Sequence, residues 1–368
     1  MKKNTEKVAI VKCRDYKKSE VDKAIKKLLE LLDFDKTKYK DVLIKPNVVG
    51  YYKENLDAII THPSIVKSLL KQFRGAAVGE SSFTDTENNL RKVGYWKLKP
   101  IVLEEKKLIK IRDEKAKILK HFYLPKIIKE ADLIINVPKL KTHTLVKITG
   151  AIKNLYGCIP GGVKQLYHRK AKGEEKFSNL LVDIYQNIKP KLNIMDAIIA
   201  MEGEGPSSGK PRKVGLLLAS RNAISLDIVA AKLMGYNPKN IFVIREAIKR
   251  GLGSYNIEII GDLKEIPNLK FQKPSRFKRA IAKAALLDIT KEEIIVNENK
   301  CIKCGLCARK CPMKAISLKP FPEIDKKKCI RCFCCIEICP HHALHLKDNT
   351  LRKIVKKIKK GKLRNSFK

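Results

Sequence analysis

The chain has 368 residues, of which 44% are hydrophobic, and its formal net charge is +41. This length and apolar content exclude a disordered chain and predict one large domain together with a smaller one. No apolar run reaches the roughly 18 residues that a membrane span needs, and no apolar segment follows the opening Met-Lys-Lys. We therefore expect a cytoplasmic protein, either free or bound peripherally at a membrane surface.

The positive charge comes mostly from lysines that are spread along the chain. A solvated, lysine-rich surface explains such a composition without any partner. An acidic redox partner protein, an anionic membrane surface or nucleic acid would also explain it. Nucleic acid is the least favoured of the three, because the sequence has no zinc-finger, RNA-binding or helix-turn-helix signature.

Residues 1–270 alternate short β-branched runs with amphipathic helical patterns. This order predicts an α/β domain with a mostly parallel sheet and flanking helices. We expect strands over residues 8–13, 41–44, 76–79, 132–137, 192–201, 214–219 and 257–260. We expect helices over residues 19–32, 125–130, 148–156, 177–188 and 224–234, and one more that opens at Thr61-His62-Pro63 with the proline in its first turn.

Polar side chains follow several of the expected strands, at the edge where parallel α/β sheets bind ligands. Lysines there suit an anionic ligand such as a phosphate or a carboxylate, whereas the acidic residues beside them suit a divalent cation. We select His143, Lys153 and Glu202 as candidate catalytic residues, because such groups can move protons. The candidate substrate-binding residues are Lys45, Asn47, Glu80, Lys139, Lys141, Thr149, Asn154, His168 and Asp196.

Two features bear on how these candidates act. A histidine such as His143 can change protonation near neutral pH, which would make it a proton donor to a reduced substrate. A structural alternative is that the lysines point separately into water, since lysines occur throughout this chain. A site requires the candidates to converge on one crevice.

Residues 271–290 are basic and alanine-rich, and they predict a helix that links the α/β domain to the C-terminal part of the chain. Residues 350–368 form a basic tail, in which Leu351, Ile354, Val355 and Ile358 recur at helical spacing. Residues 351–368 hold nine Lys or Arg and no acidic residue. Such a helix lies on an anionic membrane surface, or it is a solvated tail that packs one apolar stripe on the neighbouring domain.

Between the linker and the tail, two cysteine runs share one spacing. The first is Cys301-x2-Cys304-x2-Cys307-x3-Cys311-Pro312, and the second repeats it from Cys329 to Pro340. Bacterial-type iron–sulfur runs have this spacing, and in them the fourth cysteine of each run ligates the cluster of the other run. The spacing predicts two 4Fe–4S clusters, one held by Cys301, Cys304, Cys307 and Cys339 and one held by Cys329, Cys332, Cys335 and Cys311.

Disulfides and zinc explain these runs less well. Dense cysteines without a secretory signal favour metal binding, and zinc does not call for two four-cysteine runs that each end in proline. Cys334 aligns with Leu306 in the repeat and is not expected to be a ligand. The stretch over residues 291–349 resembles the two-cluster bacterial ferredoxin module, which implies a small α+β domain.

The α/β part also resembles a family. Residues 136–143 read NVPKLKTH and residues 149–157 read TGAIKNLYG, and shorter blocks stand at residues 45–47, 61–63, 79–81, 195–197 and 202–206 and at His168. These blocks are similar to those of the family known as domain of unknown function 362, over roughly residues 5–265. The resemblance implies that the polar blocks form one site, but it implies no particular reaction.

Together, these patterns predict an iron–sulfur protein that passes single electrons through two 4Fe–4S clusters. The electrons would go to or from an anionic substrate or cofactor in the α/β domain, as in a ferredoxin-linked oxidoreductase. The alternative is a non-catalytic electron carrier or assembly factor whose α/β domain docks an acidic partner.

Overall fold

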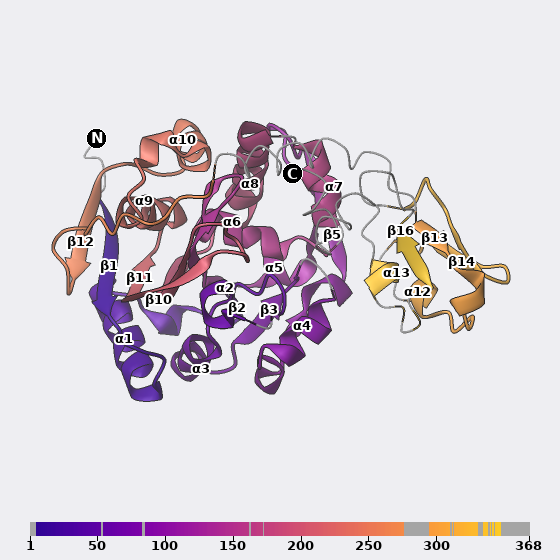
Figure 1. Ribbon diagram of the computed structural model, residues 1–368, viewed down its shortest axis with the longest axis horizontal. Coiled ribbons are helices and arrows are strands. Elements are labelled where there is room, and N and C mark those ends of the chain that lie inside the picture. The colour runs from indigo at the N-terminus through magenta and orange to yellow at the C-terminus, as the bar shows by residue number, and fades with distance from the viewer. Residues whose placement is uncertain are drawn as a thin grey trace, which may run out of the picture.

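The computed structural model describes residues 5–275, apart from 53, 83, 84, 162 and 172, and residues 294–346, apart from 310, 312, 330–333, 338, 340 and 342. The first range forms an α/β unit and the second forms a small region of short strands and helices (Figure 1). Within these ranges, no helix has the length and apolar character that crossing a bilayer demands.

The α/β unit is built on a ten-stranded sheet with the order β12-β1-β11-β10-β7-β2-β3-β4, and β8 and β9 extend it from β10. β11 runs antiparallel to both of its neighbours and β9 runs antiparallel to β8, while the other pairings are parallel. The predicted α/β class with a mostly parallel sheet is therefore confirmed. The strands are β1 (Glu6–Lys12), β2 (Val42–Lys45), β3 (Ala77–Glu80), β4 (Ile101–Val102), β7 (Leu133–Asn136), β8 (Lys139–His143), β9 (Lys147–Thr149), β10 (Leu192–Glu202), β11 (Lys210–Ser220) and β12 (Ile257–Gly261).

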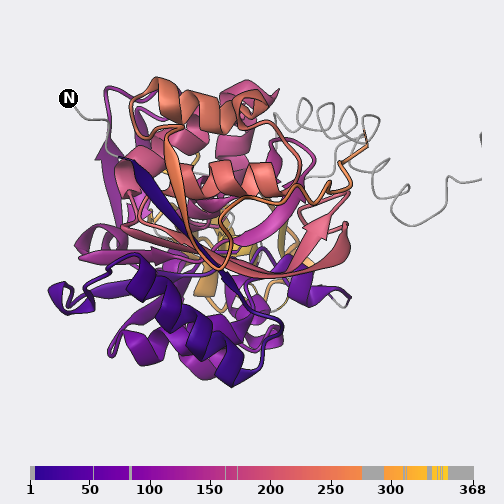
Figure 2. The ribbon, with the colours of Figure 1, turned by 90° about the vertical axis from the view of Figure 1, so that its left-hand side faces the viewer.

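Helices cover both faces of this sheet (Figure 2). Successive residues of β1 point to opposite faces, so Val8 and Ile10 join one core and Ala9 and Val11 join the other. The first core contains α8 (Gly173–Ile188), α9 (Ala223–Leu233) and α10 (Phe242–Lys249), and the second contains α1 (Lys18–Leu31) and α3 (Pro63–Gln72). The unit also has α2 (Leu56–Ile59), α4 (Thr86–Lys92), α5 (Lys126–Glu130), α6 (Ala151–Asn154), α7 (Val163–Lys170) and a separate hairpin of β5 (Leu108–Arg112) and β6 (His121–Pro125).

Local sequence explains where α3 begins. His62 is its N-cap, and the ring Nδ1 accepts a hydrogen bond from the backbone N–H of Ser64 at 3.2 Å. Pro63 fills the first helical position, where a missing N–H costs nothing. The predicted start of this helix is confirmed.

Two expected elements differ from the structure. The sequence places residues 139–143 beyond the end of a strand, but they form β8, whose backbone pairs with β10 on one side and β9 on the other. The expected helix over residues 148–156 opens instead with β9, and α6 begins only at Ala151. All five residues of β8 are buried, and pairing with β10 gives their backbone groups hydrogen-bond partners. The spacing of apolar residues along the chain does not predict this pairing.

The α/β unit continues past residue 270, its predicted boundary. Phe271 is 3% exposed and belongs to the core of α8, α9 and α10. The N–H groups of Gln272 and Ser275 donate to Glu202 Oε2 at 3.0 Å and Glu204 Oε1 at 2.9 Å. Residues 271–275 thus pack on the unit without regular secondary structure instead of starting the predicted linker helix. The rest of that helix, at 276–290, and the tail at 350–368 lie outside the described residues.

The small region repeats one pattern twice. Its elements are β13 (Ile294–Val296), α12 (Leu306–Arg309), β14 (Ile316–Leu318), β15 (Pro322–Ile324), α13 (Cys334–Glu337) and β16 (Leu344–Leu346). β13 pairs with β16 and β14 pairs with β15, both antiparallel. Each cysteine run is therefore flanked by two strands, and each strand pairs with a strand of the other run. This exchange interleaves the two halves of the repeat around one small core.

Candidate functional site

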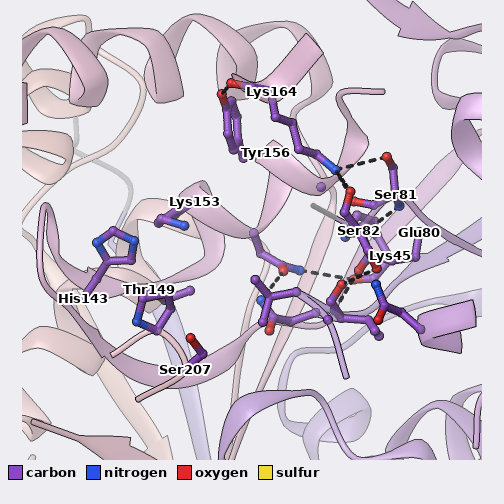
Figure 3. Close-up of a pocket in the computed structure, with 18 of the residues that line it drawn as sticks. Lys45, Glu80, Ser81, Ser82, His143, Thr149, Lys153, Tyr156, Lys164 and Ser207 are labelled. Carbon is purple, nitrogen blue, oxygen red and sulfur yellow. Dashed lines mark hydrogen bonds and ion pairs between the residues drawn. The ribbon is translucent and has the colours of Figure 1, made fainter. Parts of the chain in front are cut away.

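Four strands end at one cavity of about 430 Å³. The last residues of β2, β3, β8 and β9 line it, and α6 and α7 complete the lining (Figure 3). β2, β3 and β8 run in the same direction, and parallel α/β sheets place ligands at the edge where such strands end, because the loops that leave them diverge there. β9 runs in the opposite direction and contributes Thr149. The cavity brings together eight of the side chains selected from the sequence: Lys45, Asn47, Glu80, His143, Thr149, Lys153, Asn154 and His168.

Lys45 and Glu80 form a buried ion pair in the cavity wall, with 2.8 Å between Nζ and Oε1. Glu80 also accepts hydrogen bonds from the N–H groups of Val48 at 2.8 Å and Ser81 at 2.9 Å. Burial has the largest effect on the pKa of Glu80 and raises it, whereas the charge of Lys45 acts in the opposite direction. A methyl group on Gly157 would lie 2.4 Å from Lys45 Nζ, so only glycine leaves room for the pair.

Two further lysines at the cavity are held by backbone and amide oxygens. Lys164 Nζ donates to Ser82 O at 2.9 Å and Ser81 Oγ at 3.0 Å, and it also contacts Ser81 O. Lys141 lies behind the lining, where its Nζ donates to Asn47 Oδ1 at 3.0 Å and Ile59 O at 2.7 Å. Lys164 thus joins α7 to the segment after β3, and Lys141 joins β8 to Asn47 and α2, so both amines already have acceptors within the protein.

Lys153 differs from the other lysines of the site. It is half-buried in the lining, and it has neither a hydrogen bond nor an ion pair with the described residues. Burial first, and then the charge of Lys164, lower the pKa of Lys153 to about 8. Its amine is therefore a charged group without a counter-ion that changes protonation close to neutral pH.

Asp227 of α9 fixes the short helix that carries Lys153. Its carboxylate accepts the N–H groups of Ala151 and Ile152, which begin α6, the second at 3.1 Å. Burial raises the pKa of Asp227 to about 7. A Cβ at Gly150 would lie 2.1 Å from Asp227 Oδ1, which explains the glycine just before the helix.

His143 has a defined tautomer. Its Nδ1 accepts hydrogen bonds from the N–H groups of Leu145 at 3.0 Å and Val146 at 3.3 Å, so its proton is on Nε2. Burial, followed by the charge of Lys153, holds the pKa of His143 well below its usual range. The expectation that His143 changes protonation near neutral pH is therefore wrong, and His143 is a neutral hydrogen-bond donor.

Two lining groups lack partners among the described residues: Nδ1 of His168 and Oγ1 of Thr149 are both buried and make no hydrogen bond. The His168 ring stacks on Phe177 with 4.0 Å between centroids, and burial lowers its pKa to about 3. Buried polar atoms usually have a partner, so a ligand with complementary atoms would satisfy them.

Lys139 and Asp196 were also candidates, but they lie in a separate buried network. Lys139 Nζ donates to Asp196 Oδ2 at 2.8 Å and to the Tyr16 hydroxyl oxygen at 2.7 Å, and both charged side chains are fully buried. Asp196 also accepts the backbone N–H of His62 at 3.0 Å. This closed network joins β8 and β10 to the start of α3, and neither charged residue lines the cavity.

Glu202 does not belong to the site, which corrects its selection as a catalytic residue. Its Oε2 lies 2.7 Å from Arg212 Nη1 and accepts the N–H of Gln272. Glu202 is the last residue of β10, where the strand pairs with β11, and this pairing turns its side chain to Arg212. Each acidic candidate thus has a cationic partner, and within the described residues no three His, Cys, Asp or Glu side chains gather as around a single metal ion.

Four further side chains line the cavity without being among the candidates predicted from the sequence: Lys164, Ser82, Tyr156 and Ser207. Lys164 precedes His168 by one helical turn on α7, so helical spacing would have identified it. Nothing in the local sequence marks Ser207, which follows Pro206 in the turn between β10 and β11.

The structure describes seven of the eight cysteines that are predicted to be cluster ligands. Cys301, Cys304, Cys307 and Cys339 line one small cavity, so the fourth cysteine of the second run meets three of the first. Cys311 Sγ and Cys339 Sγ each accept a backbone N–H from four residues onward, at Ala315 and Ala343, both at 3.3 Å. Such hydrogen bonds suit cluster thiolates, whose potentials they tune. Cys332 lies outside the described residues.

The model of the family described as domain of unknown function (DUF362) matches residues 42–232, which include every one of the eight cavity residues named above. The chain belongs to this family. The model of the 4Fe-4S binding domain matches residues 294–317, the first cysteine run. The protein is thus a DUF362 member with a C-terminal iron–sulfur domain that supports electron transfer, as the sequence analysis expected.

Among known proteins, a thylakoid-associated protein of Synechocystis sp. is 30% identical over 266 residues, which cover 68% of this DUF362 chain and 82% of the relative. The lactate racemase apoprotein of Thermoanaerobacterium thermosaccharolyticum is 13% identical with a TM-score of 0.42, over 62% of this chain and 57% of the racemase. A Thermotoga maritima protein is 13% identical with a TM-score of 0.35, over 56% of each chain. At this level of similarity, neither solved structure informs the chemistry of the cavity.

Proposed function

We propose that this protein passes single electrons through two 4Fe–4S clusters to or from an anionic substrate or cofactor held in the cavity. The observation that carries the proposal is Lys153, a cationic side chain without a partner among the described residues, at a cavity that also holds unsatisfied polar atoms. A protein whose α/β unit only docks a partner has no need for such a group, because an unpaired charge in a half-buried position is costly.

The two-cluster part of the proposal rests on the repeat. One cluster is assigned to Cys301, Cys304, Cys307 and Cys339, and the other to Cys329, Cys332, Cys335 and Cys311. The shared cavity of the first set and the matching N–H···S hydrogen bonds of Cys311 and Cys339 support this assignment. When bound, the clusters supply one-electron transfer. A chain with a charge of +41 also suits an acidic redox partner protein.

The residues of the cavity take distinct roles in this proposal. Lys153 supplies the charge that draws and holds the anion, because the other lysine amines at the site are committed to oxygens of the protein. His143 Nε2–H and the Thr149 hydroxyl donate hydrogen bonds that orient the ligand. Tyr51 and Tyr52, which are 42% and 36% exposed, line the cavity where it meets solvent.

We expect the cavity to bind inorganic sulfate at pH 7 and to lose it as the pH rises through about 8. Lys153 is protonated below its pKa of about 8 and neutral above it, so the attraction is present at low pH and lost at high pH. Removing a charged hydrogen-bond donor costs about 1.5–3 kcal/mol, so Lys153→Met should weaken binding roughly 10- to 100-fold. Isothermal titration calorimetry at several pH values measures both effects.

Two variants control this experiment. Lys153→Arg keeps the charge and should keep sulfate binding while removing the loss near pH 8. Lys97→Met removes one charge from an exposed position outside the cavity and should change neither affinity nor pH profile. If Lys153→Met binds sulfate like the wild type, with the same pH profile, the anion site is not in this cavity.

We also propose that the basic tail holds the protein at an anionic membrane surface, a proposal supported by the thylakoid association that the relative's name states. Residues 351–368 hold nine Lys or Arg and no acidic residue. Each of these basic residues would add an attraction of about 1 kcal/mol near such a surface. The full chain should sediment with phosphatidylserine vesicles at low salt, and a chain without residues 350–368 should stay in solution. Equal sedimentation of the two forms would contradict the proposal, and neutral phosphatidylcholine vesicles are the control.

A further inference from the structure

We propose that Lys153 captures the carbonyl group of its substrate as an imine, so that the substrate class is a small anionic aldehyde or ketone such as a 2-oxo acid. This inference rests on the proposed function only in taking the same cavity as the substrate site. It adds a covalent step and a chemical class.

The first support is the freedom of the amine. Lys45 is bound by Glu80 and Pro46 O, Lys141 by Asn47 and Ile59 O, and Lys164 by the oxygens of Ser81 and Ser82. Lys153 alone among these four lysines has no partner among the described residues, and its side chain lines the cavity. An amine is a nucleophile only when it is neutral, and a neighbouring carboxylate would stabilise its protonated form. No carboxylate among the described residues pairs with Lys153.

The second support is the charge around the amine. The groups that act on Lys153 or on its neighbours in the lining are Lys164 and His168 of α7, Lys141 and His143 of β8, and the Lys45–Glu80 pair at the ends of β2 and β3. Burial is the larger cause that lowers the pKa of Lys153, and the charge of Lys164 adds to it. The two histidines are neutral and Glu80 is paired with Lys45, so the uncharged amine is favoured. With a pKa of about 8, roughly one tenth of Lys153 is neutral at pH 7, against about one in 2,500 for a lysine of ordinary pKa.

The third support is a set of donors for the carbonyl oxygen. His143 carries its proton on Nε2, and the Thr149 hydroxyl lacks a partner among the described residues. Both lie on the side of the cavity that Lys153 occupies (Figure 3). Hydrogen bonds from these groups would polarise a bound carbonyl toward attack.

The step balances without any further reactant. The neutral Lys153 nitrogen forms a bond to the carbonyl carbon while the C=O π bond breaks, and the two amine hydrogens pass to the oxygen through neighbouring donors. The C–O bond then breaks and water leaves, which gives the imine. No oxidant or reductant is consumed, and the protonated imine accepts electrons more readily than the free carbonyl does.

The test treats the cluster-loaded full chain with glyoxylate and sodium cyanoborohydride under anaerobic conditions and maps carboxymethyl-lysine by peptide mass spectrometry. At pH 7, modification at Lys153 should exceed that of exposed lysines such as Lys26 and Lys38 on the order of 100-fold, because of its larger neutral fraction. The rate at Lys153 should rise with pH and level off above about 8. Lys153→Arg should lose this modification while its surface lysines react as before.

Modification of Lys153 no faster than that of the exposed lysines would overturn the inference, with no variant needed. This outcome is separate from failure of the proposed function. If Lys153 stays unmodified while sulfate binds and anionic substrates reoxidise the reduced clusters, the imine is wrong and the redox proposal stands. If Lys153 is modified selectively while no anionic carbonyl compound exchanges electrons with the clusters, the imine stands and the redox proposal fails.

Discussion

Replacing Cys304 with serine should remove about half of the iron from anaerobically prepared protein. The two proposed clusters would contain about eight iron atoms, and losing one thiolate of the first would leave about four. Replacing Cys334 should leave the iron unchanged, because the repeat aligns Cys334 with Leu306 and gives it no place among the ligands. Iron analysis, together with the electron paramagnetic resonance spectrum of the reduced protein, measures the loss.

The crossing of the runs makes a further distinction. Cys339 follows the second run in sequence, yet it lines the same small cavity as Cys301, Cys304 and Cys307. Cys339→Ser should therefore perturb the same cluster as Cys304→Ser, and the two variants should have similar residual spectra. Equal iron loss in Cys304→Ser and Cys334→Ser would contradict the ligand assignment, and so would different residual spectra for Cys304→Ser and Cys339→Ser.

Replacing Glu80 with alanine should destabilise the α/β unit by about 3–5 kcal/mol. The carboxylate is 2.8 Å from Lys45, both side chains are buried, and breaking one half of such a pair leaves the other charge without compensation. It also leaves the N–H groups of Val48 and Ser81 without an acceptor. Thermal unfolding followed by circular dichroism, with cluster content matched between samples, reports the change.

A double variant separates the charge from the packing. Lys45→Met together with Glu80→Leu removes both charges and keeps most of the volume, and it should be more stable than Glu80→Ala alone. Lys23→Ala on the exposed side of α1 should change stability by less than about 0.5 kcal/mol. A Glu80→Ala protein as stable as the Lys23 control would mean that the ion pair has no part in holding the strand ends.

The large elements of the fold could be predicted because their signals are local. Amphipathic spacing in α1, the Pro63 start of α3 and β-branched runs in β7 and β10 each depend on a few neighbouring residues. The direction of β11 and the extra strand β8 could not be predicted, because they depend on pairing across residues far apart in sequence. Residues 271–275 are likewise predicted to be part of a linker, because local sequence does not reveal their hydrogen bonds to the distant residues Glu202 and Glu204.

The candidate site shows the same limit at finer scale. Position at a strand end selected Lys139, Lys141 and Lys153 alike, but only the partners of each amine decide its role. Lys139 faces Asp196, Lys141 faces Asn47 and Ile59 O, and Lys153 faces the cavity without a partner among the described residues. Glu202 looked equally promising in sequence, and the pairing of β10 with β11 turned it toward Arg212.

The most direct test of electron passage between the clusters and the cavity is a single-turnover reaction. The protein is reduced anaerobically, freed of excess dithionite and mixed with glyoxylate, pyruvate and related anionic carbonyl compounds, while the visible absorbance of the clusters is followed in a stopped-flow instrument. We predict that at least one compound reoxidises the wild-type clusters, and that Lys153→Met, with unchanged iron content, reacts at least about 100-fold more slowly, the loss expected for a key charged contact. Equal reoxidation rates of wild type and Lys153→Met across all compounds would contradict the account.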